Sequence, residues 1–160
     1  MSAISSEPAV DLDLTNKDLI ANQLWVRLTR RIARDGEVNL MLAERIMDQT
    51  LGFLKLCAER PSTESYVPSS LVDIGWHTFI LYTKEYAEFC AQITGGRFIH
   101  HYPSDEEGVD YGKGNVARTI TALKRHGLTV DEPLWTNLGT DCSGDGSCDA
   151  SSTCGGDSCS

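Results

Sequence analysis

The last twenty residues, 141–160, restrict the fold more than any other part of the chain, because they contain no large apolar side chain. They comprise four Cys, six Ser, four Gly, four Asp, one Thr and one Ala. Such a segment cannot offset the entropy of ordering by burying apolar surface, so we expect it to be disordered alone. The sequence therefore predicts a flexible N-terminus over 1–13, a helical domain over 14–138 and a Cys-rich tail over 139–160.

Helical periodicity fills the central part of the chain, where apolar residues recur every three to four positions. A first helix is expected after an N-cap at Thr15 or Asn16, with a stop at Gly36. A second helix is expected over about residues 37–60, because Pro61 cannot continue it.

A third helix is predicted over about residues 70–94, closed by Gly95 and Gly96. Its core stripe has spacings of four, three, four, three and four and consists of Val72, Trp76, Phe79, Thr83, Tyr86 and Cys90. A fourth helix should run from an Asn115 cap to Gly127. A short turn should follow at Leu134, Trp135 and Leu138. Because strand signals are weak throughout, we predict an all-α bundle of about four helices.

The charge balance limits the partners that this chain can bind. It has 23 acidic and 14 basic residues, which give a net charge of −9. Nucleic acids and anionic membranes both need a basic face, so we expect neither as a partner. Residues 1–13 lack the basic and apolar regions of a secretory signal. We therefore expect a cytoplasmic protein whose thiols stay reduced.

A short motif lies inside the predicted third helix. Residues 72–78 read Val-Asp-Ile-Gly-Trp-His-Thr, and Tyr86 is followed four residues later by Cys90. This resembles the glycine-rich domain-containing protein-like family, whose signature is Val-Asp-x-x-Trp-His-Thr, then a Tyr with a Cys four residues later. The resemblance covers 69–101, and Phe79 stands where many members have a second His. It implies a known type of domain but no particular activity.

Four residues in and after the motif are candidate metal ligands. Asp73 and His77 are four apart and should share one helix face, and His100 and His101 follow where the chain can fold back. Asp73, His77 and one of these two histidines would suit zinc, iron or manganese, which bind imidazole and carboxylate groups. Alternatively, the carboxylate could orient a histidine as a general base.

Structural roles compete with each of these assignments. Ser70 and Asp73 fit a capping box, in which the carboxylate would bind backbone N–H groups. His77 could be a core histidine that hydrogen-bonds to another helix. The other signature side chains are most simply core residues: Trp76, Tyr86 and Cys90. Gly75 in mid-helix costs about 1 kcal/mol relative to Ala, which indicates close packing by another helix.

The tail cysteines form an approximate duplication with the spacing C-x5-C-x5-C-x4-C: Cys142, Cys148, Cys154 and Cys159. This spacing differs from the C-x2-C pairs of zinc knuckles and ribbons. One hypothesis is that the thiolates capture Zn or Cu(I). A second is that the tail is the core of a ribosomally made modified peptide, with a tail-modifying enzyme as partner. A third is that the tail only keeps the protein soluble.

The sequence has no nucleophile elbow, P-loop, dinucleotide fingerprint or zincin motif. We therefore favour a non-catalytic binding or scaffold module that carries a Cys-rich tail, and we favour metal binding over a modified-peptide precursor. A small metal-dependent enzyme using Asp73, His77, His100 and His101 is the alternative from a different class. The sequence is also compatible with another protein as a partner.

Overall fold

The computed structural model describes residues 14–60, 64–102 and 116–136. These residues form a 3-10 helix and six α-helices: η1 (Lys17–Leu19), α1 (Asn22–Asp35), α2 (Leu40–Glu59), α3 (Ser70–Ile80), α4 (Thr83–Thr94), α5 (Val116–Arg125) and α6 (Glu132–Trp135). They contain no β-strand, so the predicted all-α fold is confirmed. The expected N-terminal segment, the Asn115 cap, Leu138 and the whole Cys-rich tail lie outside the described residues.

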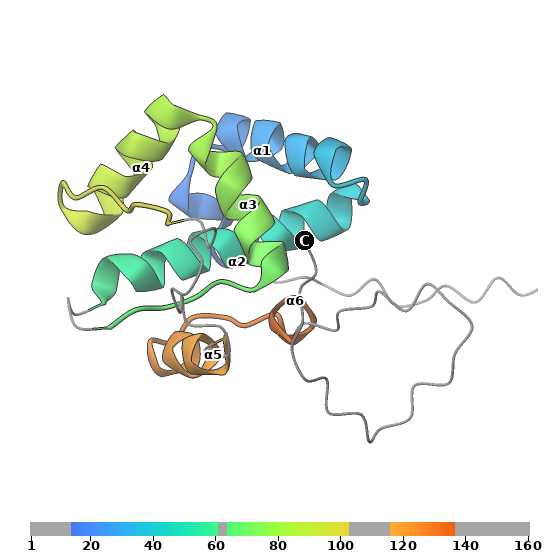
Figure 1. Cartoon of the computed structure of the whole chain (residues 1–160). Helices are drawn as coiled ribbons and strands as arrows, with labels where there is room; N and C mark the ends of the chain where they lie inside the picture. The colour runs from blue at the N-terminus through green and yellow to red at the C-terminus, as the bar shows by residue number, and fades with distance from the viewer. Residues whose placement is uncertain (1–13, 61–63, 103–115, 137–160) are drawn as a thin grey trace, which may run out of the picture.

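Helix α2 is the centre of the fold, and its predicted extent is confirmed within a few residues. The side chain of Asn39 caps it by accepting a hydrogen bond from the Leu42 N–H at 2.8 Å. Twelve of its 20 residues are buried. This follows from its position, because α1, α3, α4 and α5 all pack against it. In Figure 1, α1 and α4 lie above α2, α3 crosses it, and α5 lies below it.

The predicted first helix is divided in the structure into η1 and α1. Asn16 was expected to cap a single helix, but its side chain makes no capping bond. Instead, its backbone N–H and its amide nitrogen donate to the buried carboxylate of Asp48 at 2.7 and 3.2 Å. This contact ties the start of the chain to α2, and α1 begins only after Ala21. The predicted stop is confirmed, since Gly36 is the C-cap of α1.

The prediction of one long helix over 70–94 is wrong, because the chain bends between α3 and α4. The Tyr82 N–H donates to the Phe79 carbonyl in a tight turn, and Tyr82 has a non-helical ψ of 63°. Ten residues of straight helix would separate Trp76 from Tyr86 by about 15 Å along the axis. The bend brings the Trp76 indole within 2.8 Å of the Tyr86 hydroxyl. Thr83, expected in the core stripe, is consequently exposed.

Gly75 allows α3 to approach α2 closely, as its place in mid-helix predicted. A Cβ atom at this position would lie 2.1 Å from the Thr50 hydroxyl oxygen of α2. That hydroxyl also donates to the Val72 carbonyl at 3.1 Å, which joins the two helices directly. Asp73 and His77 lie two residues before and after Gly75, about 200° around the helix. The face of α3 that carries them therefore points away from α2.

The end of the described chain folds back over α2 and α3. The predicted stop of α5 is confirmed, with Lys124 and Arg125 in its last turn and a left-handed Gly127 at φ 70° after it. The predicted turn is helix α6, which packs against α3 and buries Leu134 and Trp135.

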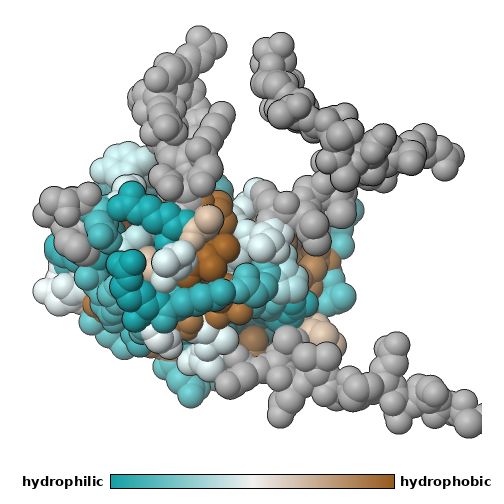
Figure 2. Space-filling view, turned by 90° about the horizontal axis from the view of Figure 1, so that it is seen from below, coloured by the Kyte–Doolittle hydropathy of each residue, from teal (hydrophilic) through white to brown (hydrophobic). Residues whose placement is uncertain are grey.

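The surface is mainly polar on the side where α5 and α6 lie. Seen from below, the described residues are mostly hydrophilic, with a band of hydrophobic residues across the middle (Figure 2). Within the described ranges, the exposed large apolar side chains are Leu40, Met41, Ile74, Leu81, Phe98 and Tyr102. Among the described helices, none combines the length and the apolar character that crossing a bilayer requires.

Candidate metal centre

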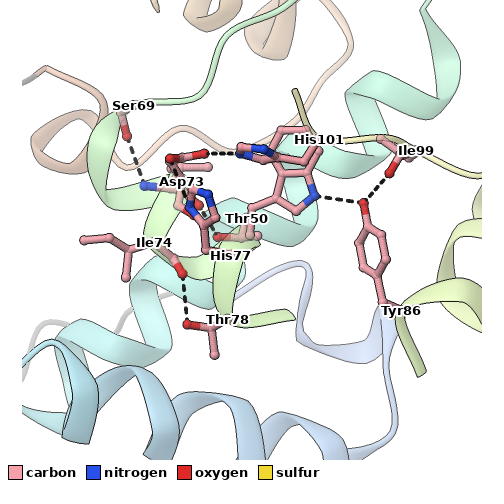
Figure 3. A network of polar contacts seen from close by, with 11 residues as sticks. Thr50, Ser69, Asp73, Ile74, His77, Thr78, Tyr86, Ile99 and His101 are labelled. Carbon is pink, nitrogen blue, oxygen red and sulfur yellow. Dashed lines mark hydrogen bonds and ion pairs between the residues drawn. The ribbon is translucent and has the colours of Figure 1, made fainter. Parts of the chain in front are cut away.

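The start of α3 leaves the carboxylate of Asp73 available for other partners. Ser69 is the N-cap, and its hydroxyl accepts a hydrogen bond from the Val72 N–H at 3.2 Å. The predicted capping box of Ser70 and Asp73 is therefore wrong, since the cap begins one residue earlier. The two carboxylate oxygens of Asp73 contact His77 and His101 instead (Figure 3).

Asp73 lies between two imidazoles. Its Oδ1 is 2.8 Å from His101 Nε2, and its Oδ2 is 3.1 Å from His77 Nδ1. The two imidazole rings also contact each other, with centroids 4.3 Å apart. One potential ligand atom from each of the three residues lies within 4.8 Å of the others. The structure therefore brings together three of the four ligands predicted in the helical domain.

The three side chains of the cluster differ in solvent exposure. The side chain of His77 is 56% exposed, that of Asp73 is 32% exposed and that of His101 is 13% exposed. The interpretation of His77 as a core histidine bonded to another helix is thus wrong. Its Nδ1 bonds within its own helix, to the backbone carbonyl of Asp73 at 3.0 Å and to the carboxylate. A ligand could reach the cluster from the His77 side.

His101 is held in place by two aromatic residues of the motif. The Trp76 ring contacts the His101 ring edge to face, with centroids 4.4 Å apart. The Trp76 indole N–H donates to the Tyr86 hydroxyl at 2.8 Å, and this hydroxyl donates to the Ile99 carbonyl at 2.7 Å. The predicted burial of Trp76 and Tyr86 is confirmed. Their hydrogen bonds were not predicted, because the pattern of apolar spacing does not report polar contacts.

His100 lies outside the cluster found among the described residues. Its ring contacts Phe98 and Tyr102, with centroid distances of 4.8 and 6.4 Å, and the residue is exposed. Neighbouring side chains of an extended segment point in opposite directions. Only one histidine of the pair can therefore face Asp73, and it is His101.

The cysteines divide into two groups. Cys57 and Cys90 are unpaired and buried, as expected from their place in helical patterns. Burial raises the pKa of the Cys57 thiol to about 12, so it stays protonated and is a poor metal ligand at neutral pH. The predicted ligands in the tail lie outside the described residues: Cys142, Cys148, Cys154 and Cys159.

One carboxylate and two imidazoles form a donor set that suits Zn, Fe(II) or Mn(II). Bonds of about 2 Å place the ligand atoms of one ion roughly 3 Å apart. The contacts of Asp73 already have this spacing, and the three ligand atoms lie within 4.8 Å of one another, so at most a small turn of one imidazole would complete the site. The exposed His77 has room for such a turn. Without a metal, the same geometry lets Asp73 orient a histidine as a general base.

The fold and the site define an all-α protein with an Asp/His cluster formed by α3 and the segment after α4. The chain belongs to the UCP032817-like family, whose model matches residues 17–116. That range contains Asp73, His77 and His101 but not the tail. No curated protein and no solved structure matches the chain significantly.

The assignment to the glycine-rich domain-containing protein-like family is therefore wrong. The family model covers 100 residues, whereas the resemblance rested on the short segment 69–101. The motif in that segment consists largely of helix-core positions such as Trp76, Tyr86 and Cys90, which are buried here. A short helical core pattern of this kind can recur in different families.

Proposed function

We propose that the helical domain is a binding module for a divalent transition-metal ion, held by Asp73, His77 and His101. The observation that carries the proposal is the convergence of one carboxylate and two imidazoles within 4.8 Å at a solvent-accessible edge of α3. Zinc is the first candidate, because a carboxylate and histidines are among its usual ligands. The role proposed is binding rather than catalysis.

Two features of the site support metal binding over a simple surface ion pair. His101 comes from a segment 28 residues away from Asp73, and it is only 13% exposed. A surface ion pair between an Asp and a His four residues apart on a helix would be complete without a third residue such as His101. The Trp76 ring packs edge to face against His101 and restricts the orientation of its imidazole.

The test is zinc titration by calorimetry on the full chain with its four tail cysteines changed to Ser, so that tail thiols do not compete. We expect one zinc per chain, with binding lost in His101→Ala and retained in the matched neighbour variant His100→Ala. The exposed His77→Ala should weaken binding while the protein stays folded. Equal zinc affinity in the His100 and His101 variants, or no binding by the parent protein, would falsify the proposal.

We propose as a second function that the tail thiols bind a soft metal ion. Two observations favour the tail as the source of thiolates. The cysteines of the helical domain, Cys57 and Cys90, are buried. Helix α6, from which the chain continues toward the tail, packs against α3, which carries Asp73 and His77. Cys142 follows Thr136 by six residues, a span of up to roughly 20 Å. A tail thiolate could thus complete the same site.

Cobalt(II) titration distinguishes a site that includes a tail thiolate from one that does not. A bound thiolate adds a charge-transfer absorption that imidazole and carboxylate ligands lack. Tail binding predicts this absorption in the wild-type chain and its loss when the four tail cysteines are changed to Ser. Mass spectrometry of the protein from its native host tests the modified-peptide alternative. A mass deficit from dehydration of tail Ser or Thr would support a peptide precursor and a tail-modifying enzyme as partner.

The small metal-dependent enzyme remains the alternative from a different class. The exposure of His77 supports it, because a bound ion would keep coordination positions open to water or a substrate. Hydrolysis assays on model esters and phosphoesters with the zinc-loaded protein separate it from pure binding. Turnover that disappears in His101→Ala and persists in His100→Ala would favour the enzyme.

A further inference from the structure

We propose that Tyr86 is a positioning residue for the metal site and that its hydroxyl group sets the location of His101. The inference rests on the proposed function, since it concerns a ligand of the same ion. Tyr86 lies on α4, which contributes no ligand to the cluster. It is 1% exposed, so its hydroxyl can act only through the protein groups that it contacts.

The Tyr86 hydroxyl uses both of its hydrogen-bonding functions on the site. It accepts from the Trp76 indole N–H at 2.8 Å and donates to the Ile99 carbonyl at 2.7 Å. Ile99 is two residues before His101, on a segment that has no regular secondary structure. A segment without helical or sheet hydrogen bonds depends on such side-chain contacts for its position.

The bond with Trp76 acts on the ring of His101 through the indole. By fixing the Trp76 indole, the Tyr86 hydroxyl also fixes the ring that contacts His101 at a centroid distance of 4.4 Å. Figure 3 shows the connection from Tyr86 to Ile99 on one side and from His101 to Asp73 on the other. The backbone two residues before His101 and the ring that packs against His101 are therefore both bonded to the Tyr86 hydroxyl.

His77 is linked to this connection by its ring contact with His101, with centroids 4.3 Å apart, and not by a hydrogen bond. It lies one helical turn after Asp73 on α3, and both of its polar contacts are made to Asp73. The hydroxyl of Tyr86 should consequently affect His101 directly and the other two ligands only through His101. This selectivity separates a positioning role from a general contribution to stability.

Tyr86→Phe isolates the hydroxyl from the ring. The Tyr86 ring packs edge to face against Phe79 and Phe98, with centroid distances of 5.2 and 5.3 Å, and phenylalanine would keep both contacts. Tyr82→Phe is the matched control. It also removes one hydroxyl near α4, but Tyr82 lies beneath the guanidinium groups of Arg27 and Arg31.

The experiment measures zinc affinity and the imidazole NMR signals of the full chain with its tail cysteines changed to Ser. We expect Tyr86→Phe to weaken zinc binding about tenfold, the lower end of the effect seen when supporting contacts of metal ligands are removed. In the zinc-free protein, the ring signals of His101 should shift. Those of His126, which pairs with Glu59 elsewhere, should not. Tyr82→Phe should change neither quantity.

Unchanged His101 signals in Tyr86→Phe would overturn the inference, whatever happens to zinc affinity. Equal shifts at His101 and His126 would also overturn it, because they would indicate general loosening. The NMR measurement uses no metal, so it decides the positioning of His101 even if zinc does not bind. A displaced His101 with unchanged zinc affinity would remove His101 from the ligand set and contradict the proposed function as well.

Discussion

His101 Nε2 lies 2.8 Å from Asp73 Oδ1, although 28 residues separate the two in the chain. This contact distinguishes a three-residue cluster from an ordinary pair on one helix face. Asp73 is free to make it because the cap of α3 is formed by the preceding Ser69. The position of the N-cap therefore decides whether the Asp73 carboxylate bonds to backbone N–H groups or to the two histidines.

Ser69→Ala should lower the free energy of unfolding by about 1 kcal/mol, the usual cost of removing an N-cap side chain. The matched variant Ser70→Ala should keep this cap, because the hydroxyl that accepts from the Val72 N–H is that of Ser69. Urea unfolding of both variants in a chelating buffer measures the difference. A larger loss in Ser70→Ala would restore the capping box that the sequence suggested.

Gly75→Ala should destabilise the protein although alanine favours helices. The new Cβ would lie 2.1 Å from the Thr50 hydroxyl oxygen and 3.1 Å from a methyl carbon of Ile46. Overpacking of this kind costs about 1–3 kcal/mol, against a gain of about 1 kcal/mol in helix propensity. Urea unfolding should show a net loss.

The companion variant for Gly75→Ala is Thr50→Ala, which removes the closest clashing atom. If the clash is the cause, the double variant should lose less stability than the sum of the two single variants. Strict additivity would mean that Gly75 is not needed for the approach of α3 to α2.

Gln49→Leu should cost about 2 kcal/mol or more, because it leaves buried donors without an acceptor. The Gln49 side-chain oxygen accepts from the Asp131 N–H at 3.0 Å and from the Trp135 indole N–H at 2.7 Å. Gln49 is 3% exposed, so water cannot easily replace it. Unfolding followed by tryptophan fluorescence measures the loss. In a Trp135→Phe background the cost should shrink, and an unchanged cost would mean that α6 is held by other contacts.

Cys57 should make the protein less stable at alkaline pH. Burial raises the pKa of its thiol from 9.0 to about 12 in the folded state. At pH values between 9.0 and about 12, the Cys57 thiol is deprotonated in the unfolded chain and protonated in the folded chain. Stability is thus fully present below the unfolded pKa and falls as pH rises toward the folded pKa. The loss should reach about 1.4 kcal/mol between roughly pH 8 and pH 10.

Cys57→Ala removes this titration and supplies its control. The variant should be less stable than the wild type at neutral pH, because it loses a buried side chain. Its stability should nevertheless fall less steeply with pH, which urea midpoints at about pH 8 and pH 10 would show. Identical slopes in the two proteins would contradict a buried thiol as the source.

Much of the helical structure was predictable because its signals are local. The span of α2 follows from apolar spacing, and the stops of α1 and α5 follow from Gly36 and Gly127. The pairing of Asp73 with His77 is equally local, since residues four apart share a helix face. The close approach of α3 to α2 at Gly75 was also predictable, because glycine in mid-helix lowers helix stability and is favoured there by close packing.

The remaining features depend on contacts between distant segments. The sequence contains no Gly or Pro at Leu81 or Tyr82, so nothing local marks the bend between α3 and α4. The bend is favoured by the packing of Tyr86 against α3 and by its bond to Trp76. Similarly, Asn16 leaves its expected capping role because the buried Asp48 carboxylate offers it two hydrogen bonds.

The sequence by itself determined that the chain is helical, where most helices stop, and that Asp73 and His77 lie together. Only the tertiary structure decided that His101, and not His100, completes the cluster. The physical reason is that apolar periodicity records which face of an element is buried, but not which distant segment lies on it. That choice comes from the hydrogen bonds of Tyr86 and the ring of Trp76, which hold the segment carrying His101 against α3.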